Sequence, residues 1–478
     1  MIAVPAVPIP SNGFPRPPAF IGAPAVRRPV RGIPPIPRNP FIAPNGDSEI
    51  HDDAWQTDAY TRGGPLGRSP RTFSSMLNPI GDCGSITFDR RGRVVSICVG
   101  LGGPRLYMFD PRTLAPLATF DLPPRQTVPT NIFQDFTGGG YFYLDDQGRV
   151  ITGTNTRHIC VIAERTGAPG FRLVRDYDLS RVLRPAEQIT SALPDSRGLE
   201  WFVARTDGVV GTLNFTTGRI RAIRLGRGAD GEIENSFATD QHGGVYIATN
   251  RRLYRFIADA NGRAKITWRI AYPNTFERKP GQVDAGTGTT PTVMPGGYVN
   301  IIDNADPMDV MVYRTALRPK WGRTVCRVPV FARGASADEN SLISVGRSMI
   351  VENNYGYTGP TSIAGGKLTA PGFERIDLSR EGRGCRVVWI NRRERAPTVV
   401  SKLSVANGLI YTYTKGPGRS DPWYWTALDF RTGRAVFKAL AGTGSFNYNN
   451  NYSGIAIGPN RTAYLGVLDG IIALRDSR

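Results

Sequence analysis

Two acidic residues stand where a repeating pattern of the chain elsewhere has threonine. In earlier copies of the repeat a Thr-Asn pair follows the second strand, and in two later copies Asp303 and Glu352 replace the threonine. A carboxylate at such a position adds charge and gains nothing in packing. Carboxylate oxygens suit a hard cation such as Ca²⁺, and two carboxyl groups can also serve as acid and base in hydrolysis. The pattern predicts Asp303 and Glu352 as catalytic residues and, with Glu339, as Ca²⁺ ligands; solvated acids that balance the arginines are the alternative.

Amide and aromatic side chains accompany these acids along the repeats. The segment from Ser445 to Tyr452 alternates the two types, which suits a sugar because rings stack on its faces while amides bond its hydroxyl groups. The structural alternative is that recurring asparagines fix turns by bonding the backbone. The predicted ligand-binding residues are Asn304, Asp306, Asn340, Asn353, Asn354, Tyr355, Lys402, Trp423, Asn450 and Asn451.

The chain has only three histidines, and two of them lie where chemistry is expected. His51 belongs to a segment, residues 50–60, that holds three aspartates and two aromatic residues outside the repeats. This segment could cross one face of the molecule and supply His51 as a base or ligand, or it could simply cap the fold through Trp55. His158 begins a strand on the same expected face, and His242 lies in a turn where we expect it to be exposed.

Several common chemistries are missing from the sequence. It contains no Gly-x-Ser-x-Gly elbow, no Gly-Lys-Ser/Thr loop for phosphates and no paired Cys-x-x-Cys spacing for zinc. The sequence contains no run of about 18 apolar residues, the length that a membrane-spanning helix needs. The net charge of +19 comes mostly from dispersed arginines. Because these form no cluster that would follow a phosphate backbone, we expect no nucleic-acid partner. The charge indicates either a general basic surface or attraction to acidic polymers or an anionic cell envelope.

The five cysteines bear on the cellular location. Cys83 and Cys98 flank a turn symmetrically, so a cross-strand disulfide is predicted there. Cys326 and Cys385 occupy equivalent positions in neighbouring repeats and are not expected to pair, while Cys160 is expected to be buried. A disulfide favours a secreted or periplasmic protein. Met1 is not followed by a charged and then an apolar region, so either a leader has been removed or the protein is cytosolic.

The elements that would position these residues are short strands that repeat with a period near 50 residues from about residue 80 onward. Gly, Asn and Asp turns separate the strands, which is typical of the four-stranded blades of a β-propeller. The units count to eight blades, or seven if one is merged. The last unit has three strands, and residues 71–76 are predicted to supply the fourth and close the ring. Residues 1–45 contain thirteen prolines and are predicted to form an extended arm, residues 46–66 a capping segment and residues 67–478 the propeller.

Three outer hairpins carry a further signal, an Asp-x-x-Thr-Gly type of turn at 110–113, 214–219 and 429–434. These turns resemble those of the PQQ-like eight-bladed propellers, so the resemblance implies that fold. The dehydrogenases of that family place an adjacent Cys-Cys pair against the quinone, and this chain has none. It also lacks the family's regular tryptophan docking positions, where Phe120 and Phe437 stand. No quinone cofactor is therefore expected, and fold alone does not give function.

Together these features predict an exported propeller that binds a small polar ligand, such as a carbohydrate or a lactone, at the mouth of its channel. As an enzyme it would be a hydrolase or a lyase. The rival prediction is a non-catalytic scaffold whose arm and basic surface dock protein partners or an anionic envelope.

Overall fold

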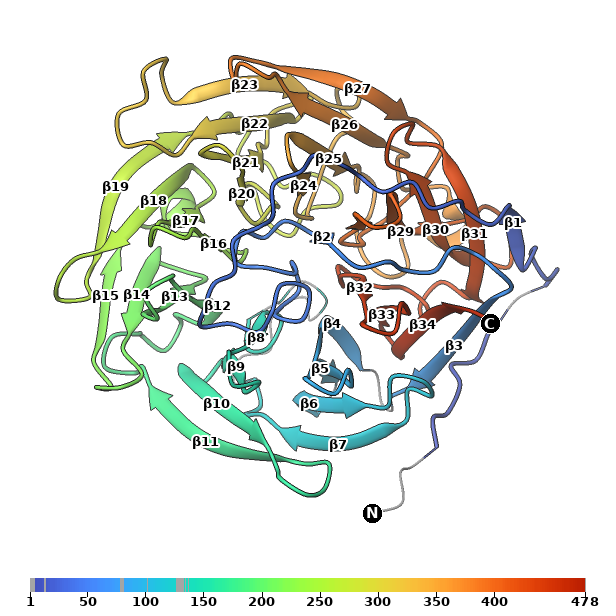
Figure 1. Cartoon of the computed structure of the whole chain (residues 1–478), viewed down its shortest axis with the longest axis horizontal. Coiled ribbons are helices and arrows are strands. Elements are labelled where there is room, and N and C mark those ends of the chain that lie inside the picture. Colours follow the sequence, from blue (N-terminus) through green and yellow to red (C-terminus); the bar gives the residue numbers. More distant parts are fainter. Residues whose placement is uncertain are drawn as a thin grey trace.

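The computed structural model describes residues 5–12, 14–77, 81–100, 102–125, 133, 135 and 137–477. Eight sheets are arranged as blades around a central channel, and strands predominate throughout (Figure 1). The predicted all-β propeller of eight four-stranded blades is confirmed, and the count of seven is wrong. Within the described residues, no helix has both the length and the apolar character needed to cross a bilayer.

Each of the first four blades consists of four consecutive strands, innermost strand first. Blade 1 contains β4 (Asp82–Phe88), β5 (Val94–Gly100), β6 (Gly103–Phe109) and β7 (Pro116–Asp121). Blade 2 contains β8 (Phe142–Leu144), β9 (Val150–Gly153), β10 (His158–Glu164) and β11 (Phe171–Asp178). Blade 3 contains β12 (Ile189–Pro194), β13 (Glu200–Ala204), β14 (Val209–Leu213) and β15 (Ile220–Arg224). Blade 4 contains β16 (Ala238–Thr239), β17 (Val245–Ala248), β18 (Arg252–Ala258) and β19 (Ala264–Ala271).

The remaining blades follow the same order, but the last two also recruit N-terminal strands. Blade 5 contains β20 (Thr292–Met294), β21 (Tyr298–Ile302), β22 (Asp309–Arg314) and β23 (Thr324–Pro329). Blade 6 contains β24 (Ile343–Val345), β25 (Ser348–Glu352), β26 (Phe373–Leu378) and β27 (Cys385–Asn391). Blade 7 contains β28 (Lys402–Ser404), β29 (Leu409–Lys415), β30 (Pro422–Asp429) and β31 (Ala435–Thr443), with β1 (Phe20–Gly22) and β2 (Ala59–Tyr60) at its two edges. Blade 8 contains β32 (Ala456–Ile457), β33 (Ala463–Val467), β34 (Gly470–Asp476) and β3 (Pro70–Met76). Short 3-10 helices, η2 (Gly228–Asp230) and η3 (Ala364–Gly366), lie in loops.

A recurring aspartate fixes the turn between the two innermost strands of blades 1 to 4. In blade 1, Asp89 Oδ1 accepts the backbone N–H groups of Arg91 and Arg93, both at 2.8 Å. Gly92 in this turn has a φ of 73°, a left-handed conformation that glycine adopts without steric cost. The same aspartate and glycine spacing recurs at Asp145, Asp195 and Asp240. The Asp-x-x-Gly sequence thus sets the hairpin geometry locally, blade by blade.

The ring is closed by strand β3, the outer strand of blade 8. It pairs antiparallel with β34 from Pro70 opposite Asp476 to Met76 opposite Gly470. The prediction that residues around 71–76 complete the last blade is therefore confirmed. Closure places a strand from the N-terminal part of the chain beside the last strand, β34, and covers the edge of that strand.

The proline-rich arm lies against the propeller (Figure 1). Strand β1 extends the outer edge of blade 7 by pairing with β31, and Ala25 and Val30 donate backbone hydrogen bonds to Leu66 and Val405. The chain then runs to the centre of the ring, turns there, and returns through β2 toward β3 (Figure 1). The arm therefore leads into the channel and does not extend away from the body.

Tryptophans dock between some neighbouring blades, although they do not recur in every repeat. The indole of Trp389 in β27 donates to Phe430 O of blade 7 at 2.9 Å, and a Cβ on Gly433 would lie 2.3 Å from its ring. Trp268 in β19 donates to Thr315 O of blade 5 at 3.1 Å. Tryptophans therefore dock between blades at some positions, although the chain lacks the regular docking pattern.

Two disulfides connect strands. Cys83 and Cys98 face each other across β4 and β5 and are bonded, which confirms the predicted pair. Cys326 of β23 and Cys385 of β27 are also bonded, so the prediction that they do not pair is wrong. Equivalent positions on the outer strands of adjacent blades lie side by side, and this brings the two sulfurs together. Cys160 is buried and free.

Removing the inter-blade disulfide should destabilise the ring. Its cysteines are 59 residues apart, so the bond restricts a long loop of the unfolded chain. Replacing Cys326 and Cys385 with alanine is expected to lower the free energy of unfolding by about 2–5 kcal/mol, measured by denaturant titration. Mass spectrometry should first verify the disulfide in the wild type. If the unfolding midpoint and slope of the double variant then equal those of the wild type, the expectation is contradicted.

Candidate functional site

Residues 46–66, the channel segment, pass through the centre of the ring and are mostly buried. Innermost strands from five blades donate backbone hydrogen bonds to the segment, each at 2.8 or 2.9 Å. The donor and acceptor pairs are Leu144 to Ser48, Thr239 to Ala54, Val293 to Trp55, Ser344 to Thr57 and Leu403 to Asp58. The segment therefore acts as a strut across the channel, and its side chains are fixed relative to the blades.

Tight turns inside the channel segment orient its polar side chains. Asp52, Gln56 and Asp58 have φ values of 78°, 66° and 55°, a left-handed conformation that aspartate tolerates better than most residues. Asp53 stabilises one turn by accepting the backbone N–H of Trp55 at 2.9 Å. These turns place His51 and Asp58 beside each other although six residues separate them.

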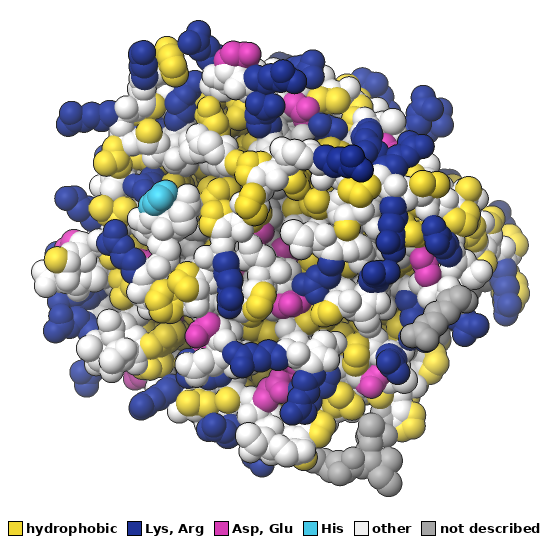
Figure 2. All heavy atoms as spheres, in the orientation of Figure 1, with side chains coloured by type: hydrophobic (Ala, Val, Ile, Leu, Met, Phe, Trp, Pro, Cys, Tyr) yellow, Lys and Arg dark blue, Asp and Glu magenta, His cyan; other side chains and the backbone are white. Residues whose placement is uncertain are grey.

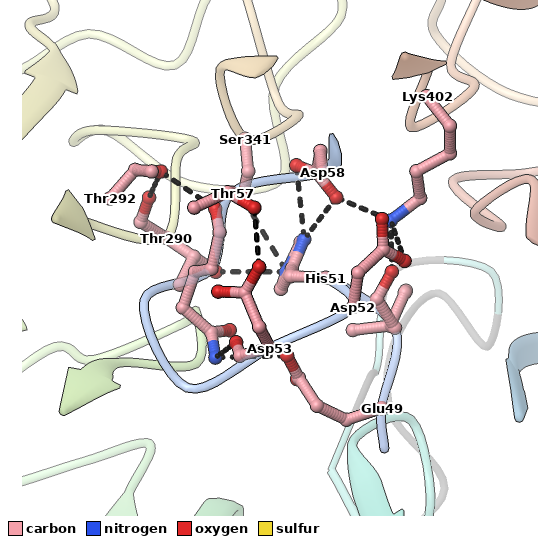
Figure 3. A network of polar contacts seen from close by, with 12 residues as sticks. Glu49, His51, Asp52, Asp53, Thr57, Asp58, Thr290, Thr292, Ser341 and Lys402 are labelled. Atoms are coloured by element: carbon pink, nitrogen blue, oxygen red, sulfur yellow. Dashed lines mark hydrogen bonds and ion pairs between the residues drawn. The ribbon is translucent and has the colours of Figure 1, made fainter. Parts of the chain in front are cut away.

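His51 is hydrogen-bonded at both ring nitrogens (Figure 3). Its Nδ1 lies 3.0 Å from Asp58 Oδ1, and its Nε2 lies 3.3 Å from Thr290 Oγ1 and 3.4 Å from Ser341 Oγ. Because the carboxylate can only accept, it selects the tautomer with a proton on Nδ1 and leaves a lone pair on Nε2. Burial, opposed in part by Asp58, lowers the pKa of His51 from its usual 6.5. His51 is therefore a neutral, oriented base at neutral pH.

Lys402, at the start of β28, holds the other side of Asp58. Its ammonium group bonds Asp58 Oδ1 and the carbonyl of Ile50, and Asp52 Oδ1 lies 3.5 Å from its Nζ. Burial works against its charge, but Asp52 and Asp58 prevail and raise the pKa of Lys402. A buried cation is stable only when it is paired in this way. The result is a chain of contacts from Lys402 through Asp58 to His51.

Three other acids of the channel segment have pKa values above their ordinary range. Burial raises the pKa of Asp52 to about 8 and that of Asp53 to about 7, and it raises the pKa of Glu49 as well. Gln56 donates to Glu49 at 2.9 Å, and Thr57 bonds Asp53 (Figure 3). Desolvation is the largest cause in each case, since these groups lie inside the ring.

A cavity of about 380 Å³ opens beside His51. Much of its polar wall comes from residues that precede or begin innermost strands, so these strand starts meet at one end of the channel. Its polar lining includes His51, Asp82, Arg125, Asp135, Tyr141, Asn235, Glu339, Asn340, Ser341, Asn451 and Tyr452. Ile97, Val99, Phe133, Val400 and Leu468 supply an apolar part. Residues from the starts of several innermost strands thus line one common cavity.

Burial favours the protonated form of two acids in this wall. Burial raises the pKa of Asp82 to about 6, although Asn451 and Ser453 donate hydrogen bonds to it at 3.0 and 3.3 Å. Burial also raises the pKa of Glu339 well above its usual value, and one of its oxygens accepts the backbone N–H of Val283 at 3.0 Å. A protonated Glu339 can donate a hydrogen bond to a ligand oxygen.

The structure does not bring together the three acids predicted to bind Ca²⁺. Asp303 accepts the backbone N–H groups of Ala305 and Asp309 at 3.0 and 2.8 Å, which makes it a turn residue of blade 5. Glu352 is buried behind the cavity wall and accepts hydrogen bonds from Asn340 and Ser401, both at 2.6 Å. Of the three, Glu339 lines the cavity. Among the described residues, no group of three or more His, Cys, Asp or Glu is arranged to hold a metal ion.

The other predicted site residues fall into two groups. Asn340 and Asn451 line the cavity with His51 and Glu339, and Lys402 supports it from behind. His158 lies on blade 2 and bonds Asp176 at 2.8 Å, while Trp423 is fully buried and stacks on Tyr413. The remaining residues lie outside the lining: Asn304, Asp306, Asn353, Asn354, Tyr355 and Asn450. Asn304 and Asn353 bond backbone carbonyls, as the structural reading of the repeated asparagines requires.

Sequence reasoning missed Asp58, Ser341, Asp82, Arg125 and Tyr141 as members of the site. Asp58 stands in the same short segment as His51, so the separation of an imidazole and a carboxylate by six residues was the available signal. Ser341 belongs to a Glu-Asn-Ser sequence that also occurs at 234–236, and such a recurrence favours a structural role. Arg125 and Tyr141 carry no local pattern.

Comparison with known proteins establishes the fold alone. No family model matches the chain. An uncharacterized protein of Archaeoglobus fulgidus is 27% identical over 271 residues, which is 51% of this chain and 52% of that protein. The chain thus spans about half the length of the curated relative it matches.

Solved structures give the same answer for the architecture. The quinohemoprotein alcohol dehydrogenase from Comamonas testosteroni superposes with a TM-score of 0.58 at 11% identity, over 92% of this chain and 82% of that chain. Sqt1 of Chaetomium thermophilum gives a TM-score of 0.51 at 12% identity, over 81% of this chain and 92% of that chain. The fold-level resemblance to PQQ-like propellers is confirmed. The five cysteines form two cross-strand disulfides and one buried thiol, so the adjacent pair of the quinone enzymes has no counterpart.

Lys402 should contribute strongly to stability. Its replacement by methionine would leave Asp58 buried without its cation, so we expect a loss of about 3–5 kcal/mol in the free energy of unfolding. Lys438→Met in the same blade removes a more exposed ion pair with Glu394 and should cost about 0–1 kcal/mol. Equal losses for the two variants would show that the buried cation has no special role.

Stability should fall as pH rises from 5 to 8. A carboxyl group with a raised pKa binds its proton more tightly in the folded state, so folding becomes less favourable once the pH passes the unfolded value near 4. Asp303, whose pKa burial raises to about 8, is one such group. Asp303→Asn keeps an oxygen for its two backbone donors and removes the titration. The melting temperature of the variant relative to that of the wild type should therefore rise between pH 5 and 8. If the difference between the two melting temperatures stays constant over this range, Asp303 does not titrate with a raised pKa.

Proposed function

We propose that the channel cavity binds a small polar ligand, such as a carbohydrate or a lactone-like molecule, and that His51 acts there as general base in its hydrolysis or cleavage. The observation that carries this proposal is His51, which lines the cavity while Asp58 behind it holds its Nδ1. Among the described residues, Nε2 of His51 contacts the hydroxyl groups of Thr290 and Ser341 at 3.3 and 3.4 Å, beside an open volume.

The size and lining of the cavity support a small ligand. A volume of about 380 Å³ falls within the range of small-molecule sites. Amide groups of Asn340 and Asn451 can bond hydroxyl groups, and the rings of Tyr141 and Tyr452 offer faces for an apolar side of the ligand. Arg125 adds a cation, which would favour a carbonyl, a carboxylate or a developing oxyanion.

We further propose that the protein works outside the cytosol. Two disulfides persist most readily in an oxidising compartment. The surface charge is compatible with an anionic envelope nearby, because Lys and Arg side chains are spread around the face and rim with fewer acidic side chains among them (Figure 2).

The scaffold hypothesis has less support. It relied on an arm that reaches partners, whereas Ile21 and Ala25 of the arm lie in backbone contact with the propeller itself. A dispersed basic surface also provides no defined docking geometry. Binding of a protein or of anionic vesicles, without any small-molecule turnover, is the result that would favour it.

Substitution of His51 tests the proposal. His51→Gln keeps the size and one donor of the side chain but cannot take up a proton, so kcat on a panel of lactones, sugar esters and 4-nitrophenyl glycosides should fall about 10²–10⁴-fold. KM should change less, because the remaining wall is intact. His242→Gln, in a turn of blade 4, is the matched control and should leave turnover unchanged. Turnover that survives His51→Gln, or a panel without any turnover or binding by calorimetry, would contradict the proposal.

The pH dependence provides a separate check. A general base is active in its neutral form, and burial lowers the pKa of His51. The acid limb of kcat/KM should therefore lie below pH 6.5, with the rate lost as pH falls through the lowered value. Asp58 and Lys402 face the imidazole from one side, and Tyr141 lies 6.4 Å away between ring centroids. An acid limb clearly above pH 6.5 would point to another base.

A further inference from the structure

The hydroxyl group of Ser341 completes an arrangement that permits covalent catalysis. We infer that Ser341 is a nucleophile activated by His51 and Asp58, and that the ligand class is an ester or a lactone bearing hydroxyl groups. This inference rests on the proposed function and narrows it from general hydrolysis to acyl transfer. It is carried by three groups in sequence: Ser341 Oγ at 3.4 Å from His51 Nε2, and His51 Nδ1 at 3.0 Å from Asp58 Oδ1.

These distances meet the requirements of a hydroxyl, imidazole and carboxylate relay. The carboxylate fixes the tautomer, the imidazole accepts the hydroxyl proton, and the contact between hydroxyl and imidazole is often longer without substrate. Ser341 comes from blade 6, whereas His51 and Asp58 come from the channel segment (Figure 3). The relay therefore exists only when the segment is seated in the channel.

Position in the cavity distinguishes Ser341 from Thr290, the other hydroxyl near Nε2. Ser341 lines the cavity together with His51, whereas Thr290 is not part of the lining. Ser341 is 8% exposed and Thr290 is 2% exposed. A ligand carbonyl in the cavity can thus approach Ser341, and Thr290 is left as a neighbour that helps to orient the ring.

A rigid turn presents Ser341 to the cavity. Asn354 accepts the backbone N–H of Glu339 at 2.8 Å, and Asp338 accepts that of Asn340 at 2.9 Å. The side chain of Asn340 is in turn held by Glu352 at 2.6 Å. Glu352, predicted from the sequence as catalytic, therefore acts as a positioning residue behind the serine.

The repeat contains its own comparison. The same Glu-Asn-Ser sequence in blade 4 ends at Ser236, whose hydroxyl bonds Ser191 Oγ of blade 3 at 2.8 Å. In blade 4 the serine at this position therefore links two neighbouring blades. In blade 6 the channel segment places an imidazole at the corresponding place, and the link becomes a candidate nucleophile.

The reaction balances with water as the only co-reactant. Ser341 Oγ bonds the carbonyl carbon while its proton passes to His51 Nε2, and the carbonyl electron pair moves to oxygen. When the carbonyl re-forms, the C–O bond to the alcohol breaks and the alcohol takes the proton from Nε2. Water then attacks the acyl-serine, gives a proton to Nε2, and releases the acid as Ser341 regains its proton. In a lactone the alcohol remains tethered to the acid.

Covalent labelling of the full-length protein tests the assignment. A fluorophosphonate reagent should label the wild type at one site, identified by peptide mass spectrometry as Ser341. Ser341→Ala and His51→Gln should abolish the label and lower hydrolysis of a 4-nitrophenyl ester or lactone about 10³-fold or more. Ser236→Ala, the matched control, should keep both the label and the activity. Melting curves of all variants verify that each is folded.

The outcomes separate this inference from the proposed function. If Ser341→Ala retains turnover that His51→Gln loses, His51 activates water directly; the proposed function then stands and the nucleophile is refuted. A label on Thr290 or elsewhere, or no label on active wild type, also refutes it. If neither variant affects turnover, both proposals fail.

Discussion

The buried contact between Lys402 and the two aspartates Asp52 and Asp58 is the interaction on which the site depends. A segment that carries several acids into the centre of a propeller incurs a large desolvation cost, and a single ammonium group offsets part of it where the segment passes blade 7. The backbone hydrogen bonds from five blades align the segment, but they would do so for any sequence. The charge pairing with Lys402 is what favours this sequence and sets Asp58 where it can orient His51.

Repetition in this chain produces two kinds of position. At one kind, a residue recurs because several blades need it for the same local geometry, as with the Asp-x-x-Gly turn of blades 1 to 4, which Asp89 begins in blade 1. At the other, a recurring residue has been given a new neighbour by a part of the chain outside the repeat, as with Ser341 beside His51. The blades thus provide the scaffold. The channel segment determines which of the repeated side chains lie beside His51.

The fold could be predicted from the sequence because its determinants are local. Turn residues and strand periodicity are read within short segments, and their repetition along the chain, with an incomplete last unit, predicts eight blades and the closing strand β3. The site could be predicted only in part. His51, Glu339, Asn340 and Asn451 were named, but Asp303 was favoured because a carboxylate in place of threonine suggests function, whereas it caps a turn. The bond between Cys326 and Cys385 was missed because register between adjacent blades is a long-range property.

The division of the site between two structural elements has a consequence for specificity. His51 and Asp58 are attached to a segment that is hydrogen-bonded along its length, while Ser341 and Asn340 are attached to a blade turn. The proposed relay requires its three groups to be held within roughly half an ångström of the reactive geometry. Here both partners are fixed by separate sets of buried contacts, so closure of a lid is not needed to assemble the relay. Because the groups of the proposed relay are preorganised, the cavity wall formed by strand entries, and not a conformational change, should determine which ligands the proposed site accepts.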